Sequence, residues 1–529
     1  GTAAGVAAAF GAPIGGVLFA LEETSSFWSK ELTWRTFFGS MISVFMVNAL
    51  VKFGDSSIDG STVSDGGLLS YGLSRDFVYR YWELIIFGML GIIGGLLGAL
   101  FVRLNIRLNE YRRDKLRKAF YFSLVEVFAV AAVTSILKFG LSMFGTCQPL
   151  SDIEFLENSC ESDSTNVTDT LDSMFCDKGE YNDFANLFLL PQDEAIQTLF
   201  SRTKSIYSMQ ALVVFLIVHF ALVTICAGLT VAGGLFVPMM LVGATYGRIV
   251  GKIIAAIFND LNPPLDPSIY ALVGCTAMMA GYSRTTISVV VIIIELTENT
   301  QYLLPIMLAV MLAKWTGDIF SHGIYEELME LKSVTFLGGH PPHNTYKLSV
   351  QEVMHKDVIC FNIQEKVSTI IDVLRNSMHH GFPVVKDTKD GRKVYCGFIL
   401  KKQLLVLLHT GQYAGAGMSQ PPMLDYEHYT SLMNRKWDID KNVNLPDKLE
   451  RGSFVMDLEI YMDKSHPIMH DAGSFLEAYR HFHTLGLRHL PIVDSDFQVV
   501  GIVTRHDLVD YFDTETEDIR HLGLDVDAE

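Results

Sequence analysis

Charged residues are scarce in this chain of 529 residues: 19% are Asp, Glu, Lys or Arg, whereas 49% are hydrophobic. So low a share of charge is unusual for a soluble protein. The apolar residues gather in long runs such as 211–227 and 288–294, which excludes a disordered chain and a disulfide framework. We therefore expect most of the chain to lie in a lipid bilayer.

Basic residues are scarcer than acidic ones, with 41 Lys and Arg against 59 Asp and Glu and a formal net charge of -18. Binding nucleic acid needs a basic face, so we expect no nucleic-acid partner. The sequence also lacks a glycine-rich loop with the lysine that nucleotide-hydrolysing enzymes use, and we expect no enzyme activity. Four cysteines without metal-ligand spacing predict no metal site: Cys226, Cys275, Cys360 and Cys396.

Apolar segments of two kinds occupy positions 1–320. A helix needs about 20 apolar residues to cross a bilayer, and the segments long enough for this are 35–53, 82–102, 120–145 and 206–226. The others are interrupted by Gly, Pro or single charges: 1–23, 229–258, 268–281, 284–296 and 302–320. Interrupted segments are typical of broken helices that line a transport site. The last 190 or so residues are mixed and polar, and we expect a separate soluble domain there.

The loops predict an orientation. Residues 103–118 carry seven basic residues and two acids, which by the positive-inside rule places them in the cytosol. Residues 150–200 carry twelve acids and one base. Near them lie Cys147, Cys160, Cys176 and the acceptor triplet that begins at Asn166. We expect this loop in an oxidising lumen, with Asn166 glycosylated and two of the cysteines bridged; the alternative is a solvated cytosolic loop with a chance triplet.

An internal repeat relates two apolar segments. At an offset of 273 positions, Gly1–Thr24 aligns with Gly274–Thr297, and seven of the 24 pairs are identical. Small apolar residues inflate such matches, but Glu22 and Glu295 each end an apolar run at the same distance from the leading glycine. Duplicated membrane halves are a common plan of transporters.

The segment Gly233-Gly-Leu-Phe-Val-Pro238 precedes an apolar stretch. The glycines free the backbone before a helix, and Pro238 suits its first turn. Such a start leaves the backbone N–H groups of Leu235 and Phe236 unpaired at the positive end of the helix dipole, which favours an anion. Backbone donors hold chloride loosely enough for fast passage. The alternative is that the glycines only allow close helix packing.

Four motifs follow one another along the chain: Ala12-Pro13, the Gly-Gly-Leu-Phe-Val-Pro segment, Glu295-Leu-Thr-Glu-Asn with Leu304-Pro305, and Gly323-Ile-Tyr325. In this order they resemble the CLC chloride channels and proton-coupled chloride exchangers. Other segments are similar to the lysosomal, endosomal and plant-vacuolar branch: Tyr181-Asn-Asp, Ala313-Lys, Gly317-Asp and Gly486-Leu-Arg-His. The resemblance implies that backbone amides of Leu235 and Phe236 and the hydroxyl of Tyr325 bind the anion.

The resemblance also leaves gaps. Two further anion motifs of the family, one with the glutamate that gates the outer site, lie upstream of a segment like residues 1–10, so we expect the chain to be a fragment that does not transport without the preceding helices. The cytosol-facing proton acceptor of the exchangers aligns with Asp193, or with Glu194 if the alignment shifts by one. As an alternative, these acids only stabilise the start of a helix.

The C-terminal region contains a second repeat. We expect a helix, two strands and a helix after Val353-Met354, and the same order after Tyr461-Met462. This arrangement resembles a pair of CBS domains. CBS pairs often bind adenine nucleotides. The second copy has Thr504 and Asp507 of a Gly-x-x-Thr-x-x-Asp turn, where the first has Leu400 and Gln403, so we expect at most one site. The resemblance places His379 and His380 beside the adenine; the alternative is solvated histidines.

Together these features predict an all-α polytopic membrane domain with an inverted repeat and broken helices, followed by an α/β CBS pair. The predicted domains are a transmembrane domain at 1–336, CBS domain 1 at 337–408, a linker at 409–455, CBS domain 2 at 456–515 and an acidic tail at 516–529. We expect voltage-dependent chloride transport in exchange for protons. The alternatives are a passive channel of the same fold and a truncated regulatory subunit without transport.

The expected partners follow from the resemblance. They are chloride or nitrate, protons, the lipid membrane, a second copy of the chain and an accessory subunit. ATP or another adenine nucleotide is expected as a regulatory ligand, and no cofactor is expected for transport. The expected location is a lysosomal, endosomal or vacuolar membrane, with the CBS domains in the cytosol.

Overall fold

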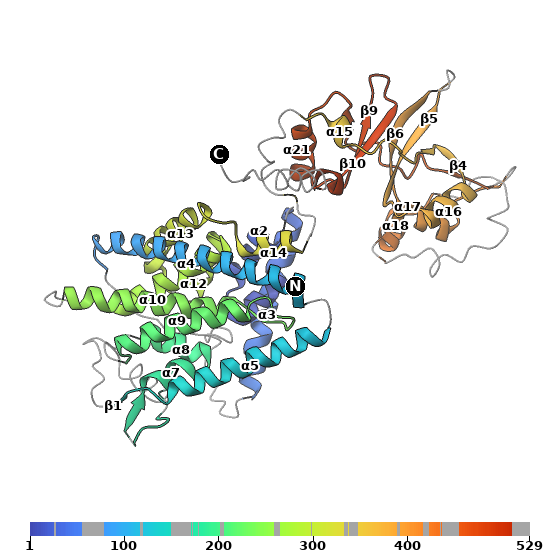
Figure 1. The fold of residues 1–529 in the computed structure, drawn as a ribbon. Helices are drawn as coiled ribbons and strands as arrows, with labels where there is room; N and C mark the ends of the chain where they lie inside the picture. Colours follow the sequence, from blue (N-terminus) through green and yellow to red (C-terminus); the bar gives the residue numbers. More distant parts are fainter. Residues whose placement is uncertain are drawn as a thin grey trace. The chain divides into compact units, whose positions relative to one another are not determined.

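The structure is a computed structural model that forms two compact units, Gly1–Val334 and Thr335–Glu529 (Figure 1). The residues that it describes are 1–25, 28–54, 79–116, 120–149, 171, 173–177, 179–201, 206–258, 265–297, 299–332, 337, 348–388, 392–415, 423–433, 435 and 454–509. Asn166, Cys160, most of the predicted linker and the predicted acidic tail lie outside these ranges. The predicted domain boundaries stay predictions.

The N-terminal unit is helical. Its elements are α1 (Thr2–Phe10), α2 (Pro13–Glu23), α3 (Lys30–Gly54), α4 (Glu83–Tyr111), the π-helix η1 (Arg112–Leu116), α5 (Phe120–Ser142), β1 (Cys147–Pro149), β2 (Glu180–Asn182), α7 (Asp183–Phe188), α8 (Gln192–Phe200), α9 (Met209–Cys226), α10 (Phe236–Ile257), α11 (Pro267–Ser283), α12 (Ile287–Thr297), the 3-10 helix η3 (Thr300–Tyr302), α13 (Leu303–Asp318) and α14 (Ile324–Leu331). The first segment breaks after α1 because Gly11 takes a left-handed conformation, with φ 65°, that other residues rarely adopt.

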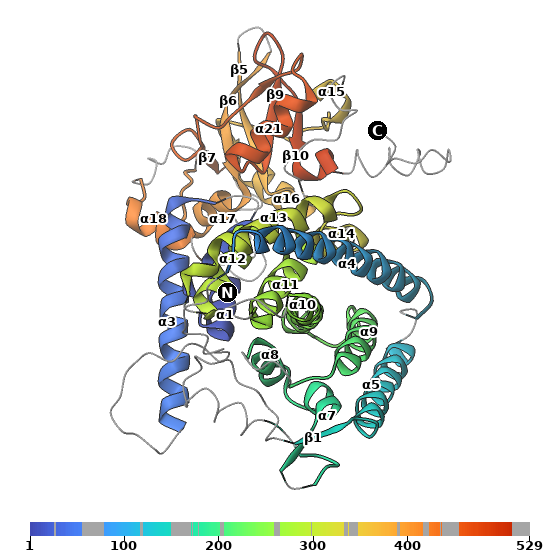
Figure 2. The ribbon, with the colours of Figure 1, turned by 90° about the vertical axis from the view of Figure 1, so that its left-hand side faces the viewer.

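Helices α4, α10 and α11 form the centre of this unit. Figure 2 shows α10 nearly end-on among α4, α8, α9 and α11. Glycines allow the close approach: a Cβ on Gly98 of α4 would lie 2.2 Å from the carbonyl carbon of Gly281 in α11, and one on Gly247 of α10 would lie 2.2 Å from the carbonyl oxygen of Tyr270. Small residues at crossings are the usual packing device of membrane helices.

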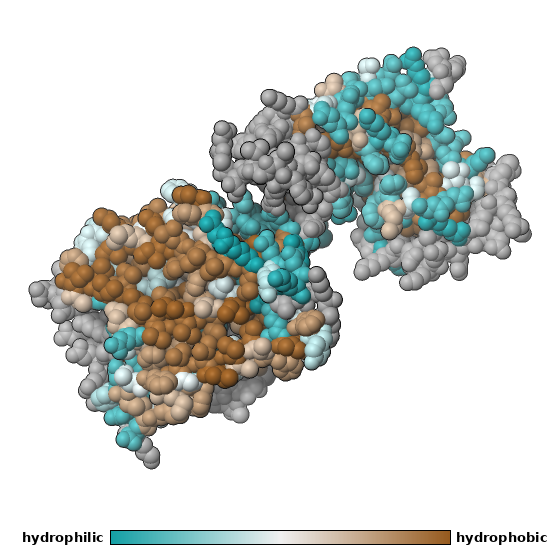
Figure 3. All heavy atoms as spheres, in the orientation of Figure 1, coloured by the Kyte–Doolittle hydropathy of each residue, from teal (hydrophilic) through white to brown (hydrophobic). Residues whose placement is uncertain are grey.

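The surface of the N-terminal unit is apolar where it faces the viewer in Figure 3. Large side chains such as Phe45 on α3 and Phe128 on α5 are 57% and 68% exposed, as expected for lipid-facing positions. Among the described residues, four helices are long and apolar enough to cross a membrane: Glu83–Lys115, Tyr121–Ser142, Met209–Cys226 and Phe236–Ile257. The first three overlap the predicted spans 82–102, 120–145 and 206–226, and the first of them continues as a helix into the predicted loop 103–118. The predicted span 35–53 lies in α3 and is not among the four. The fourth was predicted as an interrupted segment, and the interruption precedes the helix.

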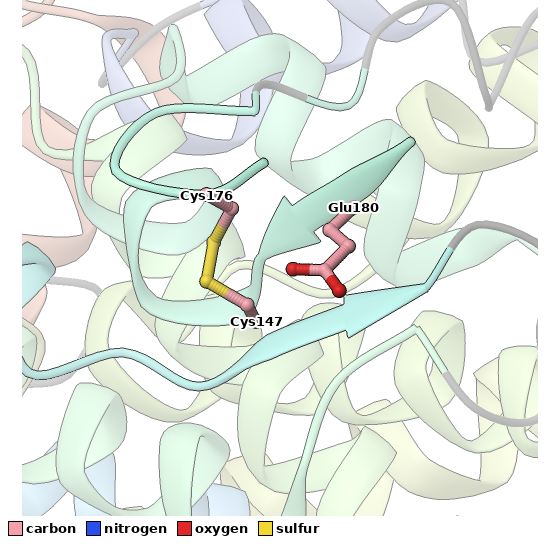
Figure 4. Close-up of side chains that lie close together, drawn as sticks. All are labelled: Cys147, Cys176 and Glu180. Carbon is pink, nitrogen blue, oxygen red and sulfur yellow. A yellow bond between two sulfur atoms is a disulfide. The ribbon is translucent and has the colours of Figure 1, made fainter. Parts of the chain in front are cut away.

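Strands β1 and β2 pair in antiparallel register, with Cys147 opposite Asn182. Cys147 is bridged to Cys176, with Cα atoms 5.7 Å apart (Figure 4), so the prediction that two of the three nearby cysteines are paired is confirmed. Glu180 lies close to both sulfur atoms, but sulfur atoms in a disulfide are not thiolate ligands for a metal.

The C-terminal unit is α/β. Its elements are α15 (Val350–Val353), β3 (Phe361–Asn362), β4 (Gln364–Lys366), α16 (Val367–Asn376), β5 (Gly381–Asp387), β6 (Lys393–Leu400), α17 (Lys401–Thr410), α18 (Tyr426–Met433), β7 (Val455–Asp457), β8 (Met469–His470), α21 (Phe475–Leu485), β9 (His489–Val493) and β10 (Val499–Thr504). A further helical stretch is described at 505–509.

The predicted repeat of the C-terminal unit has the same topology in both copies. One sheet has the order β3-β5-β6 and the other the order β8-β9-β10. In each, the first pair of strands is parallel and the second antiparallel. The copies join through backbone hydrogen bonds, such as that from the N–H of Asp463 to the carbonyl oxygen of Phe398 at 2.8 Å. The predicted fold class, a helical membrane unit and an α/β unit, is confirmed.

Candidate anion and nucleotide sites

The start of α10 has the free donors that the sequence predicted. Leu235 is the N-cap residue, and no side chain caps this end of the helix. The first helical hydrogen bond runs from the N–H of Met239 to the carbonyl oxygen of Leu235 at 3.1 Å, and Pro238 has no N–H. The N–H groups of Leu235, Phe236 and Val237 therefore stand at the positive end of a helix of 22 residues, where an anion is stabilised.

Polar side chains of α4 and η1 fix the chain that leads to the start of α10. The side chain of Asn105 donates to the carbonyl oxygens of Thr224 and Ala227 at 3.1 and 3.0 Å. Arg112, which is 2% exposed, donates to the carbonyl oxygens of Ala227 and Ile225 at 2.9 and 2.6 Å. The end of α9 is thereby satisfied inside the unit, and the loop toward Leu235 begins from a fixed point.

Aromatic rings hold the other side of the α10 start. The ring of Phe236 lies 4.7 Å from that of Phe10 at the end of α1 and 6.3 Å from that of Phe19 in α2. The first turn of α10 is therefore packed against the broken helix pair formed by residues 2–23. On the far side, the buried His219 of α9 interacts with the backbone of Pro238.

Tyr325 lies in the first turn of α14 and is half-buried. Its side chain packs against the core, and its hydroxyl interacts with the hydroxyl of Tyr282. The Tyr282 hydroxyl is buried and makes no hydrogen bond of normal geometry with a described residue. Glu23 of α2 interacts electrostatically with both tyrosines. Two hydroxyls and one carboxylate thus lie within electrostatic range of one another.

Helix α2 links Tyr325 to the α10 start. Phe19 and Glu23 are four residues apart and so share one helix face. Phe19 contacts the ring of Phe236, whereas Glu23, one turn later, interacts with Tyr325. Glu23 was not among the residues predicted from the sequence. The repeat could have pointed to it, because Glu23 directly follows the repeated Glu22, whereas Glu295 is followed by the apolar Leu296.

Asp193 and Glu194 lie elsewhere in the unit. Both are in the first turn of α8 and are partly buried, and α8 packs against α10 and α11. Acids in a first turn stabilise the helix dipole, as the alternative interpretation held. Their role in a proton pathway stays a prediction.

The C-terminal unit has a cavity of about 1280 Å³. Among its lining residues are the predicted His379, His380 and Thr504. Five Lys and Arg side chains line it: Lys401, Lys402, Arg435, Arg488 and Arg505. Six histidines line it as well: His355, His379, His380, His466, His489 and His506. The acid among the lining residues is Asp357. Cationic groups around a cavity of this size suit a polyphosphate ligand.

Asp507 holds the turn at the cavity and does not itself line it. One carboxylate oxygen accepts hydrogen bonds from the N–H and the hydroxyl of Thr504, at 2.7 and 2.8 Å. The first copy repeats this bond without the acid, because the side-chain oxygen of Gln403 accepts from the N–H of Leu400 at 2.8 Å. The charged group and the hydroxyl are found only in the second of these two turns.

His466 and His489 line the cavity, and both pack against the buried ring of Phe398. The ring of Phe398 lies 4.3 Å from that of His466 and 5.3 Å from that of His489. The pKa of His489 is lowered to about 4, mainly by burial and also by the neighbouring His466, His380, Arg488 and His379. Burial also lowers the pKa of His466. Both rings are therefore neutral near pH 7.

Comparisons with known proteins agree on the family. The model of the voltage gated chloride channel family matches residues 1–318, and the CBS domain model matches 350–410 and 457–514. Chloride channel protein C of Dictyostelium discoideum is 44% identical over 512 residues, covering 96% of this chain and 66% of that protein. H(+)/Cl(-) exchange transporter 7 of Homo sapiens is 37% identical over 520 residues, covering 97% and 62%.

Solved structures agree on the fold. The crystal structure of a eukaryotic CLC transporter superposes with a TM-score of 0.57 at 20% identity, covering 95% of this chain and 69% of that one. The chain spans about two thirds of the length of the curated relatives that it matches, 66% and 62% for the two above.

Proposed function

Because the chain belongs to the CLC family of voltage-gated chloride channels and exchangers, we propose that the complete protein moves chloride across a membrane in exchange for protons. The anion rests against the N–H groups of Leu235 and Phe236 and the hydroxyl of Tyr325. Backbone and hydroxyl donors suit this role, because they stabilise a dehydrated halide without a fixed positive charge that would retain it. The exchange activity in the name of one relative supports the choice of exchange over a passive channel.

The observation that carries this proposal is the shared face of α2. Phe19 contacts the first turn of α10, and Glu23 interacts with Tyr325. A carboxylate that can bind a proton thus stands about one helical turn from the residue that packs on the anion site. Exchange requires a proton-binding group and an anion site close enough to influence each other, and α2 supplies that connection.

We propose Glu23 as the proton acceptor in this pathway. Ionisable groups inside a membrane protein are costly and usually functional, and Glu23 is half-buried beside Tyr282 and Tyr325. Asp193 and Glu194 remain the sequence-based alternatives, and replacing each carboxylate separately decides between the three.

The regulatory ligand proposed for the C-terminal unit is ATP or a related adenine nucleotide, bound in the cavity lined by His379, His380 and Thr504. The match to CBS domains and the five Lys and Arg side chains that line the cavity support this proposal. Asp507 orients Thr504 at the start of the stretch 505–509. There is one such turn, so we expect one nucleotide per chain.

The remaining assignments rest on the family and on the loop chemistry. We propose a homodimer with one anion pathway per subunit, in a lysosomal, endosomal or vacuolar membrane and with the CBS domains in the cytosol. The disulfide between Cys147 and Cys176 supports a lumenal position for that loop, where Asn166 is the proposed glycosylation site. Voltage dependence, nitrate transport and an accessory subunit stay predictions from the resemblance.

The test is flux through the protein expressed from its complete reading frame and reconstituted into vesicles. A chloride gradient should drive protons in the opposite direction, and Tyr325→Phe should loosen anion selectivity or coupling, because the hydroxyl donor is lost. Chloride flux without proton movement would support the passive channel. Absence of both fluxes from a monodisperse, vesicle-inserted protein would support the regulatory subunit.

A further inference from the structure

The carboxylate of Glu22 binds the start of α12. One oxygen accepts hydrogen bonds from the N–H and the hydroxyl of Thr286, both at 2.7 Å. The other accepts from the N–H and the hydroxyl of Ser288, at 3.1 and 2.7 Å. Four donors at one helix start thus converge on a single side chain that lies more than 260 positions earlier in the sequence.

The carboxylate of Glu295 binds the start of α2 in the same way. Its two oxygens accept from the N–H groups of Ile14 and Gly15, at 3.1 and 2.8 Å. Glu22 lies in the last turn of α2 and Glu295 in the last turn of α12. The end of each helix therefore caps the start of the other, and the two helices lie antiparallel.

The packing between these helices is close along their length. A Cβ on Gly15 would lie 2.5 Å from Cγ1 of Ile292 and 3.0 Å from its Cα. Each helix has 11 residues, about 16 Å, which is near half of the hydrocarbon thickness. Helices of this length do not cross a bilayer, and unpaired N–H groups at a helix start inside a membrane are costly without an acceptor.

The two caps join the two copies of the sequence repeat. Glu22 and Glu295 are equivalent at the offset of 273, and so are Gly15 and Ser288. The neighbour of Glu22 is Glu23, which interacts with Tyr325, whereas the neighbour of Glu295 is Leu296, which is 5% exposed. The capping glutamate thus has an ionisable neighbour, Glu23, in the first copy and an apolar neighbour, Leu296, in the second.

We propose that the reciprocal caps of Glu22 and Glu295 clamp the two copies together, and that Glu22 is the positioning residue that holds Glu23 toward Tyr325. This inference rests on the proposed function, because it concerns the proton acceptor of that function. With four hydrogen bonds on the Glu22 carboxylate, the last turn of α2 is fixed, and with it the direction of the adjacent side chain.

The test compares Glu22→Gln with Glu295→Gln, with chloride and proton fluxes measured in the same vesicles. An amide nitrogen cannot accept from N–H groups, so each variant breaks half of one cap. A small displacement of a reacting group can cost up to about 100-fold in rate, and we expect Glu22→Gln to lower proton flux about tenfold while chloride flux changes less than about twofold. Glu295→Gln should leave the ratio of the two fluxes unchanged.

A second variant separates position from charge, because Glu22 also interacts electrostatically with Glu23. Thr286→Val with Ser288→Ala removes two of the four hydrogen bonds and keeps the Glu22 carboxylate. A positioning role predicts a fall in proton flux in the same direction as for Glu22→Gln. The double variant also tests the positioning role by itself if Glu22→Gln does not yield monodisperse protein.

Three outcomes would overturn the inference. Equal loss of both fluxes in Glu22→Gln and Glu295→Gln would show that the caps serve stability alone. An unchanged ratio of proton to chloride flux in both Glu22→Gln and the Thr286/Ser288 variant would show that Glu22 has no part in proton transfer. A fall of that ratio in Glu22→Gln alone would show that the charge of Glu22 matters and its hydrogen bonds do not. Failure of the proposed function differs from all three, since the unsubstituted protein would then move no protons at all.

Discussion

Helices α2 and α12 are the two copies of the N-terminal repeat, and they share their architecture although most of their residues differ. Both end in a glutamate that caps the other helix. The residue that follows is Glu23 in the first copy and the buried Leu296 in the second. The duplication therefore preserves the groups that satisfy the backbone, whereas the ionisable group that we propose as the proton acceptor occurs in one copy.

The C-terminal unit shows the same division. Gln403 and Asp507 each accept a hydrogen bond from the backbone N–H three residues before them. Only in the second turn does the acceptor carry a charge and bind a hydroxyl, that of Thr504. In both duplications each copy keeps the capping bond, because an unpaired backbone N–H destabilises any copy. The additional charged group, Glu23 or Asp507, occurs in one copy of each.

The largest expected effect is that of replacing Glu23, the residue at which the two copies differ in charge. Glu23→Gln should lower proton flux about 100-fold, within the range that a lost proton-transfer group costs, while chloride still passes. Flux measurements on Asp193→Asn and Glu194→Gln provide the control, and both should keep coupling. Loss of coupling in Asp193→Asn with full coupling in Glu23→Gln would instead establish the assignment made from the sequence.

The next effect concerns the equivalent positions Gly15 and Ser288. Gly15→Ser makes the two copies more alike but places a Cβ 2.5 Å from Ile292. We expect a loss of about 1–3 kcal/mol in stability, because overpacking moves backbone as well as side chains. Thermal unfolding of the purified protein measures it. Gly39→Ser in α3 is the control, since its Cβ would meet nothing within 4 Å.

The third effect compares the two turns of the C-terminal unit. Asp507→Ala should weaken ATP binding by about 1–3 kcal/mol, through loss of charge-assisted hydrogen bonds that hold Thr504 at the cavity. Gln403→Ala should leave the affinity unchanged. Calorimetric titration of ATP into the purified protein measures both. Equal affinities in the two variants would remove Asp507 from the site.

The smallest effect is the pH dependence of the same unit. The pKa of His489 falls from 6.5 to about 4 in the folded unit, so the unfolded chain binds the extra proton between these values. The contribution to stability is complete above about pH 6.5 and is lost as the pH falls toward 4. Thermal unfolding at pH 7 and pH 5 should show this fall, and His489→Gln should reduce it. An equal fall in the variant would assign the effect to other groups.

Local patterns account for the parts of the fold that the sequence predicted well. The break between α1 and α2 follows from Gly11 and Pro13, and the uncapped start of α10 follows from Gly233, Gly234 and Pro238, since these residues act on the backbone beside them. The sequence limited the disulfide to two of three cysteines. The tertiary structure decides that Cys147 pairs with Cys176, because it brings these two residues together.

Long-range interactions account for what local patterns could not predict. The electrostatic interaction between Glu23 and Tyr325 joins positions about 300 residues apart, whereas Asp193 was named as proton acceptor from the alignment and stays a prediction. The hydrogen bond from Thr504 to Asp507 spans three residues, but the cavity beside that turn is lined by residues from His355 to His506. Where such distant elements meet has no local pattern in the sequence.

The sequence by itself determined the kind of environment each segment occupies, the places where helices break, the two duplications and the family. These properties depend on hydropathy and on backbone preferences of single residues, which act locally. Only the tertiary structure decided which carboxylate stands beside Tyr325 and that Glu22 and Glu295 cap each other's helices. Antiparallel packing of α2 on α12 brings each free helix start to the other's last turn, and a partner chosen by packing has no signature along the chain.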